Sequence, residues 1–511
     1  MHQLKFFTAL NKLIITTLLL IPSFILAGPL SGNFNLTIAP GTLTECAVTL
    51  LWQKQSAQPS GQYQLLFNGK VYGKTTKSNF TAKDLKAGTL YSVQVKGSTG
   101  EIIGIIKFKT AIAGKIYNVI DFGAKGDSVT KNTHAIQAAI DACTAGGTVL
   151  IPKGTFLSGA LFLKSNMTLS IAKGGVLKGS LEVADYLPMI PNRFEGWELK
   201  TYASLLNAGN LVRNGSYTVK NLRITGGGTI SGGGRKLGDA MVKANGLRSR
   251  GRLICLMSCQ NVSISDLDIR ETPCWNIHYI YSNNITCHDL NIVSRVHNGD
   301  GIDPDSSTDS YIFNCTFDTS DDCIAIKSGK NPEGFTIGKP TKNVRITDCD
   351  FKAGHGISIG SEMSGGISDI FVQDCNAGKL LHGFQIKGTK ERGGYVRNVT
   401  VEDCQLLQIT IYSEVNYNND GAAAPTVPVF ENFLFRNIDL SKAPHEVPVM
   451  NLNGFKEIGH QLKNVTFTNI SVPENAKIII KNASQLKFNN VKSKNGTVPG
   501  FDMTDCSDIV R

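Results

Sequence analysis

A short phrase recurs through the second half of the chain, and it restricts the folds that are open to the sequence. It reads NVSISDLDI from Asn261, NITCHDLNI from Asn284, NVRITDCDF from Asn343 and NVTVEDCQL from Asn398. Copies spaced by about 20 to 30 residues are typical of solenoids, in which each repeat buries its apolar face against the next. The strands are too short for a conventional hairpin meander, and the pattern of leucine-rich repeats is missing. We therefore predict an all-β protein whose main part is a right-handed parallel β-helix.

Two side-chain types recur in step with this phrase. The tripeptide N-x-S/T is a glycosylation signal, but here it begins the repeating strand, which favours a structural role for Asn261, Asn284, Asn398 and Asn464. Twelve cysteines in 511 residues are too few for a disulfide scaffold. Several of them share one position in the phrase, which indicates a stacked structural position: Cys315, Cys349, Cys375 and Cys404.

The first 27 residues are typical of an export signal. Lys5 and Lys12 precede the apolar run 13–27, and Ala27-Gly28 offers a small-residue cleavage site. A membrane anchor is the alternative, but the run is short for a spanning helix. We expect a secreted or periplasmic protein with no stable membrane association once residues 1–27 are removed.

Two units are expected after the signal. Residues 35–113 form short alternating strands split by Gly, Asn and Asp turns, with Trp52 early and Leu85-x-x-Gly88-x-x-Tyr91 late. This stretch resembles a fibronectin type III domain, a resemblance that implies a small β-sandwich with Trp52 and Tyr91 as core anchors. Residues 114–511 form the β-helix. An amphipathic helix from Asn132 to Cys143 is expected to cap its first rung.

Four segments that follow the repeating strands share a second register. They read DGIDPDSS from Asp300, DCIAIKSG from Asp322, HGISIGSE from His355 and HGFQIKGT from His382. Period-two alternation turns two rows of side chains into the core: Ile302, Ile324, Ile357 and Phe384, and Pro304, Ile326, Ile359 and Ile386. The rows between them face outward: Asp303, Ala325, Ser358 and Gln385, and Asp305, Lys327, Gly360 and Lys387. Equivalent residues on successive rungs lie about 5 Å apart, so Asp300, Asp322 and His355 should stack on one wall, with Asp321 beside Asp322.

A cluster of carboxylates on one wall has two chemical explanations. Like charges this close raise at least one pKa, as a catalytic acid and base require. The same oxygens suit calcium, as in a calcium-dependent pectate lyase. His355 and Lys387 belong to the same wall, and a fixed cation beside a calcium site is unfavourable, so we expect no metal and no other cofactor. A non-catalytic polysaccharide-binding or adhesin β-helix is a third possibility.

The wall resembles that of glycoside hydrolase family 28, the polygalacturonases. The motifs that match are Asn298-Gly299-Asp300-Gly301, Asp321-Asp322, Gly354-His355-Gly356 and Ile386-Lys387. The likeness runs from about residue 117 to the C-terminus and is greatest to bacterial exo-acting members, some of which carry an N-terminal fibronectin-like domain. It implies hydrolysis of α-1,4-galacturonosidic bonds by inverting single displacement. Asp321 is then the general acid, Asp300 and Asp322 hold and deprotonate the attacking water, and His355 tunes Asp321.

The resemblance also implies a binding site for the sugar carboxylate, and the chain departs from the family there. Lys387 is the expected ligand, but Gln385 replaces the arginine that the family has two residues earlier. Glutamine can hydrogen-bond a carboxylate but cannot form a charged bidentate clamp. Xylogalacturonan and rhamnogalacturonan hydrolysis therefore stay open, although His355 argues against the second. Further candidate ligands are Asn298, Arg392 and Tyr417, and Arg248, Arg250 and Arg252 are other sources of charge.

Charge and loop lengths complete the expectation. The formal net charge is +11, which suits a polyanionic partner, and no motif indicates nucleic acid. We expect a monomer that binds an acidic polysaccharide, polygalacturonate or pectin. Exo action with release of mono- or digalacturonate is favoured, because the long segments 186–210 and 235–252 could close one end of a cleft. Endo action is the alternative.

Overall fold

The computed structural model describes residues 36–54, 61–378, 380, 382–414, 421–444 and 446–511. The predicted export signal and Tyr417 lie outside these residues. Among the residues described, no helix combines the length and the apolar character needed to span a membrane.

The N-terminal part is a small antiparallel sandwich of two sheets. One sheet has the order β1 (Thr37–Ile38), β2 (Val48–Leu51), β5 (Asn79–Ala82). The other has the order β4 (Lys70–Thr75), β3 (Tyr63–Phe67), β6 (Leu90–Lys96), β7 (Ile102–Lys109). Trp52 is buried between the sheets with its ring edge against Tyr63. Tyr91 stacks on Phe108 and accepts a hydrogen bond from the Lys86 amide, so both predicted anchors lie in the core or at its edge.

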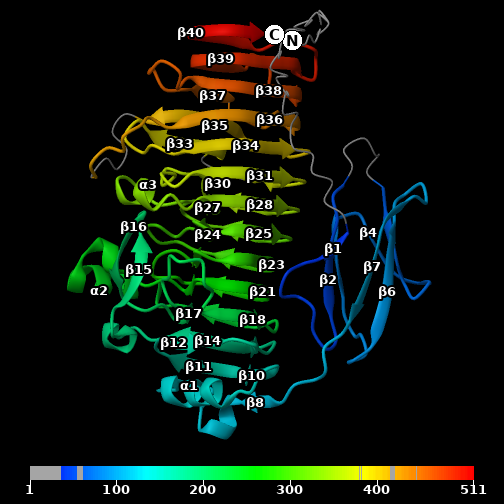
Figure 1. The fold of residues 1–511 in the computed structure, drawn as a ribbon, viewed down its shortest axis with the longest axis vertical. Helices are drawn as coiled ribbons and strands as arrows, with labels where there is room; N and C mark the ends of the chain where they lie inside the picture. The colour runs from blue at the N-terminus through cyan, green and yellow to red at the C-terminus, as the bar shows by residue number, and fades with distance from the viewer. Residues whose placement is uncertain (1–35, 55–60, 379, 381, 415–420, 445) are drawn as a thin grey trace, which may run out of the picture.

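The rest of the chain winds into a parallel β-helix whose strands form three stacks (Figure 1). This confirms the predicted architecture. The first stack comprises β8 (Ile116–Asn118), β10 (Gly147–Ile151), β13 (Met167–Ile171), β18 (Val219–Thr225), β21 (Cys259–Arg270), β23 (Asn283–Val293), β25 (Thr308–Phe313), β28 (Thr341–Thr347), β31 (Ile367–Gln373), β34 (Tyr395–Glu402), β36 (Val429–Asp439), β38 (Leu462–Ser471), β39 (Lys477–Lys492) and β40 (Gly500–Val510).

The second and third stacks are built from shorter strands, and the longest strands of the first stack bend into them. The second stack comprises β9 (Asp127–Lys131), β11 (Gly154–Ser158), β14 (Gly175–Gly179), β19 (Thr229–Ser231), β26 (Thr316–Asp318), β29 (Asp350–Ala353) and β32 (Asn376–Ala377). The third stack comprises β12 (Leu161–Leu163), β17 (Leu206–Gly209), β20 (Ile254–Met257), β22 (Ile277–Ile280), β24 (Ile302–Asp305), β27 (Ile324–Ile326), β30 (Gly356–Ile359), β33 (Gly383–Thr389), β35 (Gln408–Glu414) and β37 (Met450–Asn453).

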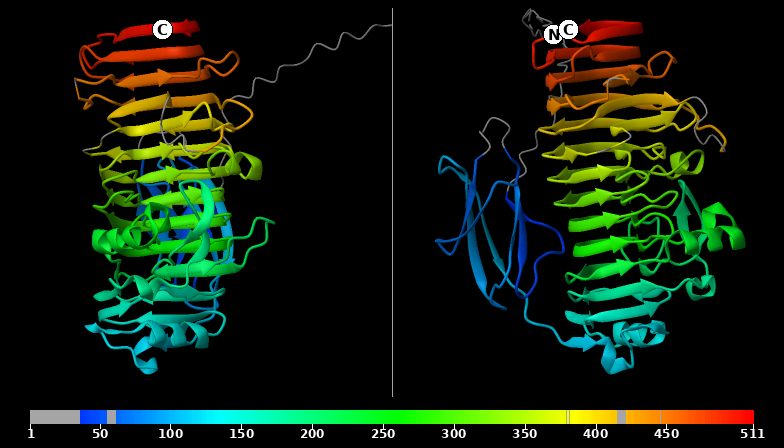
Figure 2. Two further views of the ribbon diagram at one scale, coloured as in Figure 1. Left: turned by 90° about the vertical axis from the view of Figure 1, so that its left-hand side faces the viewer. Right: turned by 180° about the vertical axis from the view of Figure 1, so that it is seen from behind.

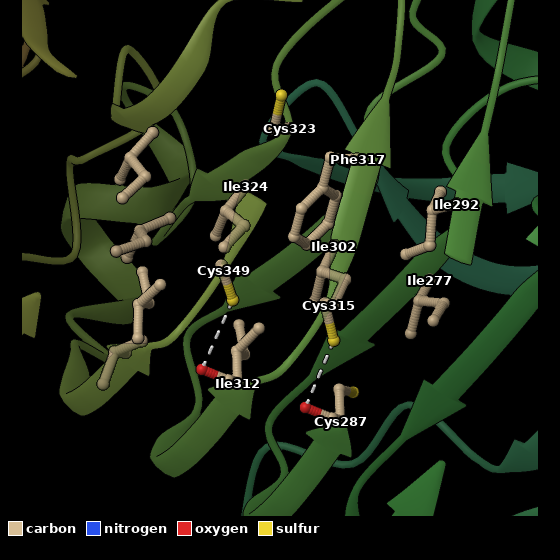
Figure 3. Packing of buried hydrophobic residues seen from close by; sticks show 14 of the residues in the cluster. Ile277, Cys287, Ile292, Ile302, Ile312, Cys315, Phe317, Cys323, Ile324 and Cys349 are labelled. Carbon is tan, nitrogen blue, oxygen red and sulfur yellow. Dashed lines mark hydrogen bonds between the residues drawn. The ribbon is translucent and has the colours of Figure 1, made fainter. Parts of the chain in front are cut away.

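The core repeats from rung to rung in the predicted register. Ile302 pairs with Ile324, Ile324 with Ile357 and Ile357 with Phe384. Figure 3 shows Ile277, Ile302 and Ile324 side by side in the interior. The recurring cysteines lie in the same interior, where the thiol of Cys315 donates to the Cys287 carbonyl, and all of the chain's cysteines are free thiols.

The asparagines of the repeated phrase serve the turns of the solenoid. Asn261, Asn284, Asn398 and Asn464 all have φ between 55° and 58°, a left-handed conformation that asparagine adopts more readily than most residues. Their amides form ladders between rungs, as where Asn464 donates to Asn432 and Asn432 to Asn398. The structural role predicted for these positions is therefore observed.

The predicted helix is α1 (Thr133–Ala142), which buries Ile136, Ala139 and Ile140 against the first turn. The sequence patterns missed two further helices, α2 (Gly234–Asn245) and α3 (Glu333–Ile337). They also missed an antiparallel hairpin, β15 (Ile190–Phe194) with β16 (Trp197–Thr201). The described residues also form three short 3₁₀ helices, η1 (Val119–Phe122), η2 (Val183–Tyr186) and η3 (Leu247–Ser249).

The sandwich and the hairpin lie on opposite sides of the β-helix (Figures 1 and 2). The sandwich contacts the first stack, where Leu51 packs on Phe313 and the Lys54 ammonium lies 2.7 Å from Asp374. The hairpin and α2 stand over the third stack. The third stack therefore faces away from the sandwich, and it carries the residues considered next.

Candidate active site

Asp300, Asp322 and His355 precede successive strands of the third stack, β24, β27 and β30. The amide of Gly301 donates to the Asp322 carbonyl at 3.0 Å, and the amide of Cys323 donates to the Gly356 carbonyl at 2.9 Å. These ladder bonds stack the three predicted residues on adjacent rungs. Asp321 lies in the same turn as Asp322, and its carbonyl accepts from the His355 amide at 3.1 Å.

Asp322 is a buried carboxylate surrounded by donors. Its Oδ1 accepts from Ser358 Oγ at 2.6 Å and from Gln385 Nε2 at 3.3 Å, and His355 Nδ1 lies 3.1 Å away. Its Oδ2 accepts from Lys387 Nζ at 3.2 Å. Burial alone would raise the pKa of Asp322, but Lys387 and His355 outweigh burial and hold the pKa well below its usual range. The surroundings of Asp322 therefore favour its ionised form.

Asp300 is equally buried but has a different environment. Its Oδ2 accepts from Lys327 Nζ at 3.3 Å, whereas Oδ1 has no hydrogen-bonding partner within the part of the chain that the structure describes. Burial, followed by the charges of Asp303 and Asp321, raises the pKa of Asp300 well above its usual value, and Lys327 only partly opposes this. Asp300 therefore binds a proton more strongly than Asp322 does.

Lys327 lies at the centre of a buried charge cluster beside Asp300. Its Nζ is 3.3 Å from Asp303 and 3.2 Å from Glu362, and it lies 4.6 Å from the centre of the Trp275 ring. Burial alone would lower the pKa of Lys327, but these carboxylates raise it well above its ordinary value. Burial raises the pKa of Asp303 to about 7, although Lys327 opposes the shift. The cluster thus holds one fixed cation among several acids.

Asp321 and His355 are the more accessible members of the site, with 24% and 27% of their side chains exposed. Asp321 Oδ1 accepts from the Asp322 amide at 2.8 Å and lies 3.4 Å from His355 Nδ1. The hydrogen bond to Asp322 is the main cause that raises the pKa of His355. His355 therefore contacts both aspartates, whereas the sequence analysis linked it to Asp321 alone.

The predicted carboxylate ligands Lys387 and Gln385 lie on β33, one rung beyond His355. Both are almost fully buried, and both contact Asp322. Gln385 also accepts from Tyr412 Oη at 2.9 Å. Its amide is thus engaged with protein groups, a point that no sequence pattern indicated.

The remaining predicted ligands lie farther out. Asn298 has φ of 54° in the turn before Asp300, and its Oδ1 accepts from Arg250 Nη2 at 2.7 Å. Arg392 is fully buried, and its guanidinium donates to the Ser361 carbonyl at 2.9 Å and to Asn331 Oδ1 at 2.6 Å. These contacts hold loops together; a role of Asn298 or Arg392 in binding substrate stays a prediction.

The other arginines considered as charge sources also have protein partners. Arg252 is buried against the Trp275 ring, and Arg250 supports the turn that holds Asn298. Arg248 is partly exposed but pairs with Glu195 at 2.8 Å. None of the three contacts Lys387 or Gln385 in the hydrogen bonds and ion pairs found among the described residues.

The hairpin β15–β16 is fixed to the third stack beside the site. Arg193 Nη1 donates to Asp305 Oδ1 at 2.7 Å and to Ser306 Oγ at 2.8 Å. Burial would raise the pKa of Asp305, but Arg193 and His278 hold it well below its usual range. Farther along, Trp197 Nε1 donates to the Asn331 carbonyl at 2.9 Å. The hairpin therefore spans several rungs on one side of the aspartates.

Asp321, Asp322 and His355 could in principle bind a metal ion, because their ligand atoms all lie within 4.8 Å of one another. The ammonium of Lys387, 3.2 Å from Asp322, already neutralises that carboxylate. A divalent cation here would face both Lys387 and the readily protonated His355. The donor set therefore fits proton transfer better than metal binding.

The sequence analysis missed four residues of the site. Ser358 and Lys327 belong to rows already predicted to face outward, so their proximity to the acids could have been predicted from the sequence. Tyr412 pairs with Lys387 on the next rung, and an extension of the register by one strand identifies it. Glu362 follows the end of β30, and no periodic signal marks it.

Comparisons with known proteins agree on one family. The family model described as Glycosyl hydrolases family 28 matches residues 144–477, more than half of the chain. The exo-poly-alpha-D-galacturonosidase of Dickeya chrysanthemi is 26% identical over 577 aligned positions, which cover 96% of this chain and 94% of that protein.

Two solved structures are similar as well. The family 28 exopolygalacturonase of Yersinia enterocolitica has a TM-score of 0.84 at 26% identity, and the match covers 93% of this chain and 98% of that one. The hyperthermoactive exopolygalacturonase of Thermotoga maritima has a TM-score of 0.58 at 25% identity, covering 77% and 92%.

The raised pKa of His355 predicts a pH-dependent contribution to stability. A group whose pKa is higher in the folded state stabilises the fold fully below its unfolded pKa of about 6.5, and this stabilisation is lost as pH rises through the folded value. We expect the melting temperature of the wild type to exceed that of His355→Gln by most in mildly acidic buffer. The difference should shrink as pH rises past neutrality; a difference that does not change with pH would contradict the pairing.

Proposed function

The chain belongs to family 28 of the glycosyl hydrolases, and we propose from this premise that it hydrolyses the α-1,4-galacturonosidic bonds of polygalacturonate. The observation that carries the proposal is the wall formed by Asp300, Asp321, Asp322 and His355 with Lys387 beside it. The relatives named as exo-acting galacturonosidases, one of them matched over almost the whole chain, support the same substrate.

The charge of the site supports an acidic sugar as the ligand. Lys387 is nearly buried on the wall, and a positive charge interacts more strongly with a carboxylate where water is largely excluded. The net charge of the chain, +11, favours approach of a polyanion. We infer that Lys387 binds a galacturonate carboxylate next to the scissile bond.

The environments of the three aspartates support different roles in an inverting displacement. Asp321, partly exposed and bonded to the Asp322 amide, is the general acid that protonates the glycosidic oxygen. Asp300, whose pKa is raised by burial and by the charges of Asp303 and Asp321, is the stronger base and takes the proton of the attacking water. Asp322, held ionised by Lys387, orients that water on the face of the sugar opposite to the leaving group.

The hairpin supports exo action. Arg193 joins the hairpin to Asp305 of the third stack. Glu195, in the turn of the hairpin, pairs with Arg248 in the connection between α2 and β20. A rigid obstacle on one side of the acids limits how much polymer can extend in that direction. We infer that the enzyme binds a chain end and releases mono- or digalacturonate.

Export is part of the proposal, because pectin lies outside the cell that degrades it. The basic, apolar residues 1–27 support it. We infer a secreted or periplasmic protein whose mature chain lacks these residues. Mass spectrometry of the exported protein tests this, and retention of residues 1–27 would contradict it.

A time course of polygalacturonate digestion tests the function. Saturated mono- or digalacturonate should appear from the first minutes, without a ladder of oligomers and with no loss of rate in a chelator. An early ladder would contradict exo action. Unsaturated products that depend on calcium would contradict hydrolysis altogether.

Asp321→Asn is the matched control for this digestion, since it keeps the shape of the side chain and removes its proton. The rate should fall roughly 10²- to 10⁴-fold, the usual contribution of one general acid. Binding of polygalacturonate should persist. A variant that keeps the full rate would contradict the role of Asp321.

A further inference from the structure

Gln385 occupies the place where the family has an arginine, and the structure surrounds it with protein groups. It lies on β33 in register with Ser358 on the rung before and Thr410 on the rung after. Only 1% of its surface is exposed. A residue that binds a sugar needs a polar atom directed at the sugar. The partners of the Gln385 amide therefore decide whether it can bind substrate.

The hydrogen-bonding capacity of Gln385 is almost fully used. Nε2 donates to Ser358 Oγ at 2.6 Å and to Asp322 Oδ1 at 3.3 Å, which uses both of its protons. Oε1 accepts from Tyr412 Oη at 2.9 Å. Any bond from this amide to a substrate carboxylate would require one of the bonds to Ser358 or Asp322 to break.

The same contacts converge on one catalytic oxygen. Ser358 Oγ donates to Asp322 Oδ1 at 2.6 Å while it accepts from Gln385. The chain of bonds therefore runs from Tyr412 through Gln385 and Ser358 to Asp322. Tyr412, Gln385 and Ser358 are all neutral. Among the described residues, Lys387 supplies the only lysine or arginine charge that bonds directly to Asp322.

We propose that Gln385, with Ser358 and Tyr412, is a positioning residue for Asp322 and not a ligand for the sugar. The chain of neutral donors fixes the orientation of the Asp322 carboxylate, and Lys387 carries the recognition of the substrate's charge. This inference rests on the proposed hydrolysis of polygalacturonate, because it assigns roles within that site.

The two possible roles of Gln385, binding the sugar and positioning Asp322, affect different kinetic parameters. Loss of a group that only binds the substrate raises KM and leaves kcat unchanged. Loss of a group that orients a catalytic carboxylate lowers kcat, since a small misplacement of the carboxylate slows the reaction.

Two variants test the proposal on trigalacturonate. Tyr412→Phe removes one hydroxyl and keeps the ring, and Gln385→Met removes the amide and keeps the length of the side chain. For both, kcat should fall roughly 10- to 100-fold while KM changes by less than about threefold.

Thr410→Val is the matched control. Thr410 is buried on the next rung of the same row, and its hydroxyl has no hydrogen-bonding partner among the described residues. This variant should keep the wild-type kcat and KM. Melting temperatures of all three variants separate a loss of folding from a loss of positioning.

The possible results distinguish a failure of the positioning role from a failure of the proposed hydrolysis. A rise in KM with unchanged kcat would overturn the positioning role while wild-type hydrolysis stands. No release of galacturonate by the wild type would overturn the proposed function itself. If Gln385→Met fails to fold, Tyr412→Phe alone decides.

Discussion

The in-register ladder of parallel strands is the constraint on which the site depends. Each rung of the third stack repeats the backbone pairing of the one before, so Ile302, Ile324 and Ile357 stand in one buried row. A shift of one residue would exchange the buried and outward rows. The apolar side chains in the core of the β-helix therefore determine the positions of the acids on its wall. Asp300 and Asp322 face the same side because Ile302 and Ile324, two residues after them, are stacked.

Charge balance then gives chemically identical side chains different roles. Lys327, Gly360 and Lys387 occupy one outward row, with the glycine between the two lysines. Lys327 is shared between Asp300 and two other carboxylates, so Asp300 keeps a raised pKa. Lys387 bonds Asp322, which has further donors and a lowered pKa. The distribution of two ammonium groups among neighbouring acids thus shifts the pKa values of Asp300 and Asp322 in opposite directions.

Features that follow the period of the chain were predictable from sequence, and features made by contacts between loops were not. The rows of the third stack, the turn asparagines and helix α1 all come from local periodicity, and each was found where it was expected. Hairpin β15–β16 and helix α2 come from irregular insertions, and Glu362 reaches Lys327 from beyond a strand end. Gln385 was identified as a departure, but its partners Ser358 and Tyr412 became clear only from side-chain geometry. The contacts of Arg392 with Ser361 and Asn331 also join loops and follow no period of the chain.

The central claim is that three aspartates of one wall carry out a single displacement, with water held opposite the leaving group. The stereochemistry of the first product tests this claim most directly. Proton NMR of an oligogalacturonate digest, recorded before the free sugar equilibrates, resolves the anomers. The account predicts that the β-anomer appears first, because the water attacks from the face opposite to the α-linked leaving group. Initial formation of the α-anomer would contradict it, since retention requires a covalent intermediate on one of these carboxylates.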